Sequence, residues 1–358
     1  MARAALTPDE IRAARAERIE AAQAVLADAV AGLRTSEDWT QFLRFQSKLH
    51  DYSANNVLLI AAQHAQAFAD GKVDTPFPTY VASYRRWQGL DRQVERGQSG
   101  YAVIAPLRAK RRIATDSDGQ TRLLAADDTA GPGETEHVQQ VMRGFTVEKV
   151  FALEQTTGEP LPEPPRPKLL EGQAPAGLGE AVMRLIESRG FTVATVADAG
   201  LIGGANGLTA WRERTVTVRA DMDDAAMVKT LTHEAGHVLL HNPDDGSTPP
   251  GMPRAQMEVE AESVAFVVAH AHGMDAGEYS FPYVASWAGP EPDEVVAKTA
   301  TRVARVAKQI IAISPAEHAD GGRAPAADHA ASRTASVAVA VAVVPASDRA
   351  HDIQGVAG

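Results

Sequence analysis

Near the start of the chain, apolar side chains recur at helical spacing in three consecutive segments. Thr7-Pro8-Asp9-Glu10 is a typical helix start, because it combines a capping hydroxyl, a proline in the first turn and a glutamate three residues after the cap. The apolar stripe that follows extends to Leu33. Two more helices are predicted at residues 36–49 and 53–68. The pattern therefore predicts a helical N-terminal region.

Strand and turn signals replace the helical spacing further along. Short strands are predicted at 77–80, 101–107 and 144–154, with a helical turn at 84–90. Residues 108–139 are polar, contain several glycines and show no periodicity. We therefore expect this segment to be a long loop between two strands.

A proline-rich segment at 156–178 separates this region from further helices and strands. It contains six prolines, which is typical of a linker. Helices are predicted after it at 180–189, 225–241, 255–271 and 292–313, and strands at 191–196 and 215–219. We expect 215–219 to be an edge strand that can hold an extended peptide by strand addition.

These elements predict an α+β protein with two domains. The expected boundaries are a small mixed domain at 1–155, a linker at 156–178, a second domain at 179–313 and a tail at 314–358. The tail is rich in alanine and poor in aromatic residues, so we expect it to be disordered.

Length and composition narrow the class of protein. The 358 residues are enough for two domains. The longest apolar run, 335–346, is shorter than the roughly 20 residues that a membrane-spanning helix needs, and the N-terminus lacks the apolar core of a signal peptide. We therefore expect a cytoplasmic protein with no membrane partner. The absence of cysteine excludes disulfides, thiol catalysis and cysteine-bound zinc.

The charge is unevenly distributed. The net charge is -11, yet residues 36–112 contain 11 basic and 7 acidic side chains, a balance of +4. A mildly basic segment in an acidic protein can contact nucleic acid there. An ordinary scatter of solvated charges is the alternative interpretation.

Candidate metal chemistry comes from the segment His233-Glu234-Ala235-Gly236-His237. On a helix, His233 and His237 lie one turn apart on the same face and can bind one Zn²⁺ ion together. Glu234 can then act as a general base toward water at the metal. The alternative is a helix that happens to carry two ordinary histidines.

A catalytic zinc site needs a third protein ligand, and a later predicted helix offers two. Glu258 and Glu262 are four residues apart and share a helix face. We assign Glu258 as the ligand and Glu262 as the acceptor of a hydrogen bond from a ligating histidine, with the reverse assignment left open. A solvated acidic patch is the alternative. The phenol of Tyr283 can stabilise an oxyanion or serve only in packing. Three further histidines are interpreted as non-ligands: His241, His270 and His272.

Two groups of segments carry a resemblance to known proteins. The later group comprises residues 229–241, 258–265 and 279–283. The earlier group comprises residues 39–45, 52–60, 84–90 and 94–106. The later group resembles antirestriction proteins of the ArdC type and related zincins of the ImmA/IrrE group. The earlier group is similar to the N-terminal single-stranded-DNA-binding domain of the ArdC type. Residues 108–139 and the chain after Pro315 match no motif of that family.

The resemblance implies a single-stranded-DNA-binding domain joined to a zincin-like metallopeptidase domain. Single-strand binding needs cations along the backbone and flat rings for base stacking. The residues that can supply such contacts are Asn55, Asn56, Arg85, Arg86, Trp87, Arg92, Arg96 and Tyr101. Packing in a small domain is the alternative role for the aromatic side chains.

Three functions are compatible with these features. The leading prediction is a zinc metalloendopeptidase that cleaves an unknown protein substrate and is coupled to single-stranded DNA in antirestriction, mobile-element or stress regulation. The alternative is a non-proteolytic protein that shields single-stranded DNA and uses zinc structurally; the presence of Glu234 favours the enzyme over this alternative. A third is a protease whose first domain binds protein, and salt-dependent oligonucleotide binding would separate it from the first.

Overall fold

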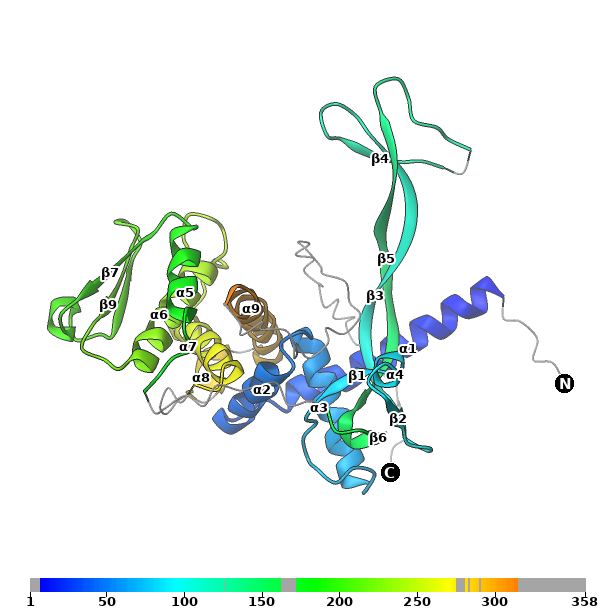
Figure 1. Ribbon diagram of the computed structural model, residues 1–358, viewed down its shortest axis with the longest axis horizontal. Helices are drawn as coiled ribbons and strands as arrows, with labels where there is room; N and C mark the ends of the chain where they lie inside the picture. Colours follow the sequence, from blue (N-terminus) through cyan, green and yellow to red (C-terminus); the bar gives the residue numbers. More distant parts are fainter. Residues whose placement is uncertain are drawn as a thin grey trace, which may run out of the picture. The chain divides into compact units, whose positions relative to one another are not determined.

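The computed structural model describes residues 7–125, 127–161, 172–274, 281–282, 284–289 and 291–314. The described residues belong to one compact unit that mixes helices and sheets, which confirms the α+β class (Figure 1). Residues 162–171 of the predicted linker and the predicted tail after Ser314 fall outside these ranges. No helix within them is long and apolar enough to cross a membrane.

Three helices begin the described chain, as predicted. They are α1 (Pro8–Ala31), α2 (Ser36–Lys48) and α3 (Ala54–Ala69). In α1 and α2, the hydroxyls of Thr7 and Thr35 accept from the backbone amide three residues later, and the acidic side chain at that later position accepts from the amide of the threonine. These short-range bonds explain why the sequence marks the helix starts so clearly.

A long two-stranded ribbon follows these helices. Strand β3 (Tyr101–Thr115) pairs antiparallel with β5 (Thr135–Ala152) along its whole length, and Figure 1 shows the two strands twisting around each other. The sheet has the order β1-β5-β3-β4, with short strands β1 (Val81–Ser83) and β4 (Thr121–Leu123) at its edges. The prediction of a loop at 108–139 was therefore wrong. Many side chains of the outer ribbon face solvent, so its strands carry no apolar alternation for sequence analysis to detect.

The predicted strand at 77–80 was also wrong. Pro76 and Pro78 remove two of the backbone donors that a strand needs, so pairing begins only at Val81. The helical turn predicted nearby is α4 (Tyr84–Gln88).

A second, smaller pairing connects this region to the start of the predicted linker. Strand β2 (Arg92–Val94) pairs with β6 (Thr156–Gly158), so regular structure extends into the range predicted as linker. Two 3₁₀ helices complete the short elements: Leu153–Gln155 and Ala199–Ile202.

The second half of the chain contains a three-stranded sheet of order β7-β9-β8. Strand β9 (Thr215–Arg219) lies in the centre, parallel to β7 (Thr192–Val196) and antiparallel to β8 (Gly207–Ala210). The expectation that 215–219 is an edge strand was therefore wrong. Strand β8 covers that side, and its four residues beginning at a glycine give no strand signal.

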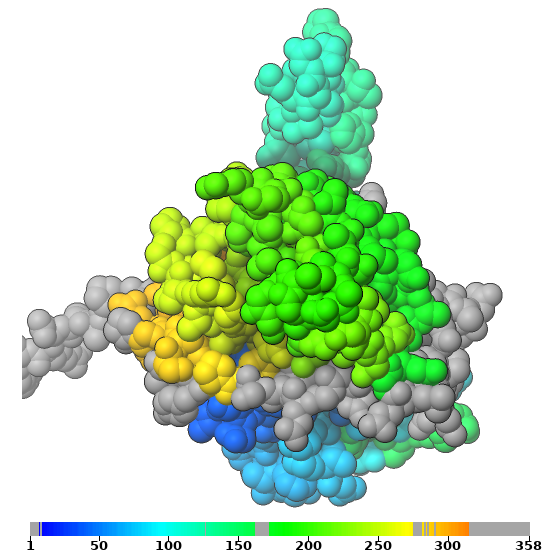
Figure 2. Space-filling model, turned by 90° about the vertical axis from the view of Figure 1, so that its left-hand side faces the viewer, coloured from blue at the N-terminus to red at the C-terminus, as the bar shows by residue number. Residues whose placement is uncertain are grey.

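Five helices accompany this sheet: α5 (Leu178–Glu187), α6 (Asp224–Leu240), α7 (Arg254–Ala271), α8 (Val284–Ala288) and α9 (Pro292–Ile313). Helices α6 and α7 pack closely, and Figure 2 shows the yellow-green and yellow parts of the chain, to which they belong, side by side. A Cβ atom added at Gly236 would lie 3.0 Å from the Cα of Ala261. The glycine therefore permits the approach that brings the two helices into register.

Helix α2 of the first predicted domain packs against α7 of the second. The fully buried Trp39 donates from its indole Nε1 to the hydroxyl of Ser263, over 2.9 Å. Its ring also contacts Trp287 edge to face. Ser263 directly follows Glu262, so this interface supports the helix that carries both predicted glutamates.

Candidate metal centre

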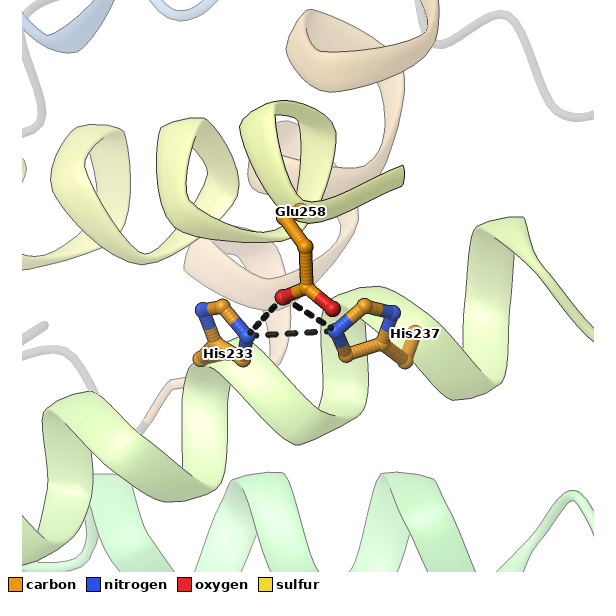
Figure 3. A group of neighbouring side chains, drawn as sticks. All are labelled: His233, His237 and Glu258. Carbon is orange, nitrogen blue, oxygen red and sulfur yellow. Dashed lines mark hydrogen bonds and ion pairs between the residues drawn. The ribbon is translucent and has the colours of Figure 1, made fainter. Parts of the chain in front are cut away.

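Three predicted ligands meet where α6 faces the first turns of α7 (Figure 3). His233 and His237 present their Nε2 atoms to each other at 3.1 Å. Each of these nitrogens lies 3.4 Å from Oε2 of Glu258. Among the described residues, these three form a group whose ligand atoms all lie within 4.8 Å of one another.

This triangle has the dimensions of a metal site. Zinc bonds to histidine nitrogen and carboxylate oxygen are about 2.0–2.2 Å long, which places neighbouring ligands of a tetrahedron roughly 3.3 Å apart. The observed separations of 3.1, 3.4 and 3.4 Å match that spacing. Two imidazoles and one carboxylate also leave a fourth position for water or another ligand. The residues present therefore fit a divalent cation.

The Glu258 carboxylate is half exposed at the start of α7. Hydrogen bonds from His233 and His237 hold its pKa far below the usual range. The exposed Arg254 lies 3.4 Å from its other oxygen. Glu258 is therefore charged at neutral pH, as a ligand to a cation must be.

His233 is supported on its far side by a second carboxylate. Its Nδ1 lies 2.9 Å from Oε2 of Glu262, and the amine of Lys229 lies 3.4 Å from Oε1 of the same carboxylate. Burial acts to lower the pKa of His233, but the bonds to Glu258 and Glu262 outweigh it and raise the pKa to about 9. In the metal-free protein this ring holds a proton that an incoming cation must displace.

His237 is supported by residues that the sequence analysis left without a role. Its Nδ1 lies 3.0 Å from Nδ1 of His241, and Nε2 of His241 lies 3.1 Å from Oε2 of Glu260. Burial lowers the pKa of His241, so this imidazole is neutral at physiological pH. The spacing of the two histidines could have indicated this contact, because His241 follows His237 by one helical turn.

Glu234 lies against strand β8. It is buried, and its Oε2 accepts a hydrogen bond of 2.6 Å from the hydroxyl of Thr209. A Cβ atom added at Gly207 would lie only 2.7 Å from its Oε1, so a side chain at that position would displace the carboxylate. Neither residue was identified from the sequence, because β8 itself was not predicted.

Three of the predicted DNA contacts are buried instead of lying on the surface. Trp87 donates to the carbonyl of Phe151 over 3.0 Å. The guanidinium of Arg92 donates to the carbonyl of Thr156, and the hydroxyl of Tyr101 is bonded to the buried His64. In this structure these side chains stabilise the fold, which corrects the expectation that they face nucleic acid.

Asn56 also has a structural task. Its side-chain amide bonds both the carbonyl and the amide of Ile104, at 3.0 and 2.9 Å, and so satisfies the edge of β3 where β4 does not reach. Of the remaining predicted contacts, Arg85 and Arg96 are exposed, whereas Asn55 and Arg86 are partly buried. Tyr283 lies outside the described residues.

Residues 12–151 match the family model described as the N-terminal domain of anti-restriction factor ArdC. The chain is also 25% identical over 304 residues to the uncharacterized protein pXO2-81 of Bacillus anthracis. That alignment covers 78% of the chain but 48% of the relative, so the chain spans about half the length of the curated relative it matches.

Two crystal structures of the antirestriction ArdC protein from the R388 plasmid are similar. The metal-free structure is 18% identical with a TM-score of 0.41, covering 72% of this chain and 84% of that one. The Mn(II)-bound structure is 17% identical with a TM-score of 0.46, covering 84% of this chain and 98% of that one. The residues of the candidate metal centre lie beyond the range that the family model matches.

Proposed function

We propose that this chain is an antirestriction protein that binds single-stranded DNA through residues 12–151 and carries a divalent metal ion between α6 and α7. The observation that carries the antirestriction part is the match of residues 12–151 to the N-terminal domain of anti-restriction factor ArdC. The mild excess of basic side chains at residues 36–112 supports the DNA-binding part. The triangle of ligand atoms supports the metal-binding part.

His233, His237 and Glu258 would hold the ion. Two imidazoles and a carboxylate favour Zn²⁺, although such sites also accept other divalent ions. When bound, the ion would supply Lewis-acid chemistry, or, in a purely structural role, would fasten α6 to α7. The fit of the ligand triangle supports both roles equally.

A second candidate function, a zincin-like metallopeptidase acting on a protein substrate, is favoured by the surroundings of Glu234. Thr209 engages Oε2, and the absence of a side chain at Gly207 allows Oε1 to keep its position. Oε1 would then accept a proton from water and return it to the leaving amine. A structural site needs no such base. Tyr283 remains the proposed oxyanion donor of this candidate.

DNA binding is tested with a fluorescent single-stranded oligonucleotide at several salt concentrations. We expect affinity to fall as salt rises, because bound phosphates release counterions. Replacing Arg85 and Arg96 with glutamine should flatten the salt dependence. The exposed Lys298 on α9, replaced in the same way, is the matched control and should change nothing. Binding that is absent, or independent of salt, overturns the DNA-binding part of the proposal.

The two candidate functions are separated by protection of unmodified DNA in a restricting host, measured with Glu234→Gln. This variant keeps the shape and the metal ligands but removes the base. Protection at the wild-type level supports the shielding function and rejects the peptidase. Protection that is lost while metal and DNA are still bound supports the peptidase.

A further inference from the structure

A chain of buried polar side chains leads from the candidate metal centre into the protein. It runs from Nδ1 of His237 to Nδ1 of His241 over 3.0 Å, and from Nε2 of His241 to Oε2 of Glu260 over 3.1 Å. The side chains of His241 and Glu260 are 1% and 0% exposed, so water does not compete for these bonds. The path joins the end of α6 to the middle of α7.

Glu260 is fixed from three further directions. Arg302 of α9 donates from Nε to Oε2 over 2.8 Å. Thr299 and Gln256 donate to Oε1 over 3.1 and 3.4 Å. The remaining nitrogens of Arg302 donate to the carbonyls of Leu240 and Ser247, which also holds the end of α6 in place. Each acceptor position around this carboxylate is therefore used, as a buried charge requires.

These contacts determine where the protons lie when His237 binds a cation through Nε2. The single remaining proton of that ring must be on Nδ1, which makes Nδ1 a donor. His241 must then accept at its own Nδ1 and carry its proton on Nε2. That proton is donated to the carboxylate of Glu260. Only this order of donors and acceptors satisfies all three groups with a neutral His241.

The two candidate histidine ligands differ in how they are supported. His233 bonds directly to Glu262, a carboxylate that is partly exposed. His237 reaches its carboxylate only through a second imidazole, deep in the core. Glu260 also forms an ion pair with Arg302 of α9. His241 is the group that connects this pair to the metal ligand.

We propose that His241 and Glu260 are positioning residues for the metal centre, acting as a buried relay that fixes the tautomer of His237 and directs its Nε2 toward the cation. The proposal rests on the metal site of the proposed function, but not on any catalytic role for it. Partners that orient a ligating histidine contribute about 10–100-fold to metal affinity. The relay would thus hold His237 in its binding orientation before the ion arrives.

The test compares zinc affinity, by competition with a chelator, and the visible spectrum of bound Co²⁺ in full-length variants. His241→Phe keeps the ring shape and removes the acceptor, so we expect affinity to fall about 10–100-fold and the spectrum to change. His241→Asn places an acceptor near the lost Nδ1 and should recover most of the affinity. Wild-type affinity and spectrum in the phenylalanine variant overturn the relay.

His272→Phe is the matched control, because it removes an imidazole bonded to the carbonyl of Val268 and the hydroxyl of Ser314 without touching His237, His241 or Glu260. It should lower stability and leave zinc affinity within about threefold of wild type. An equal loss of affinity in this control would mean that general weakening of the core explains the effect, and would reject the relay. If His241→Phe does not fold, Glu260→Gln replaces it: weaker zinc binding supports the relay and unchanged binding rejects it. Absence of zinc binding in the wild type would instead reject the metal site itself.

Discussion

Different interactions stabilise the packed helices α6 and α7 and the ribbon of β3 and β5. Around the candidate metal centre, specific side chains are bonded in a fixed order, and Gly236 allows the helices to touch. The ribbon is held by backbone pairing, and Val138 and Met142 of β5 are 63% and 48% exposed. Side-chain identity should therefore matter greatly in the helices and little along the outer ribbon.

The largest effect is expected where the two helices touch. Gly236→Val places methyl groups against the backbone of Ala261 and should destabilise the protein by about 3 kcal/mol and abolish metal binding. Gly89 is the matched control: its φ is also negative and a Cβ there would be 3.6 Å from its nearest neighbour. Gly89→Val should cost roughly 1 kcal/mol or less. Urea unfolding measures both, and equal losses would contradict the account of this contact.

A smaller loss of stability is expected from a substitution in strand β8. Thr209→Val removes the donor to Glu234 and leaves a buried carboxylate oxygen without a partner, at a cost of about 1–3 kcal/mol. Thr195 lies exposed on β7 of the same sheet, so Thr195→Val should change the unfolding free energy by less than about 0.5 kcal/mol. Indistinguishable unfolding curves for the two variants would show that the bond to Glu234 contributes nothing.

The metal centre should also respond to pH. The pKa of metal-free His233 is raised to about 9, so below that pH the ring is protonated and the cation must displace the proton. Apparent zinc affinity should fall about tenfold for each pH unit below 9. In Glu262→Gln one cause of the raised pKa is gone, and the fall should begin at a lower pH. Affinity that is constant between about pH 7 and 9 in the wild type would contradict the elevated pKa.

The smallest effect is expected on the ribbon. Val138→Ala and Met142→Ala should each change the unfolding free energy by less than about 0.5 kcal/mol, because both side chains are largely exposed. Thermal melts with and without added zinc measure this. A loss comparable to that of Gly236→Val would mean that the ribbon side chains are packed in solution, and the comparison of the two regions would fail.

The same difference explains what the sequence could predict. His233, Glu234 and His237 are close in the chain, and a helix brings them together through its own geometry. Glu258 and Glu262 follow on another strongly patterned helix. The helix start at Thr7 is equally local. Such local patterns can be recognised in the sequence without knowledge of the tertiary structure.

Long-range pairing left no comparable signal. The outer parts of β3 and β5 pair with each other although both strands carry polar side chains there. Strand β8 begins with Gly207, where a side chain would collide with Glu234, a residue far away in the sequence. The sequence also could not decide the roles of Trp87 and Tyr101, because an aromatic residue beside cations is typical both of a DNA-binding surface and of the core of a small domain. Only burial distinguishes the two.

The most direct test of the account is the metal content of the purified full-length protein, measured by elemental analysis beside His237→Ala and Glu258→Ala. We expect about one divalent ion per wild-type chain after zinc is supplied, and loss of that ion in both variants, with folding checked by circular dichroism. An ion retained in folded Glu258→Ala would show that another residue is the third ligand. A wild-type protein that binds no metal at all would contradict the central claim.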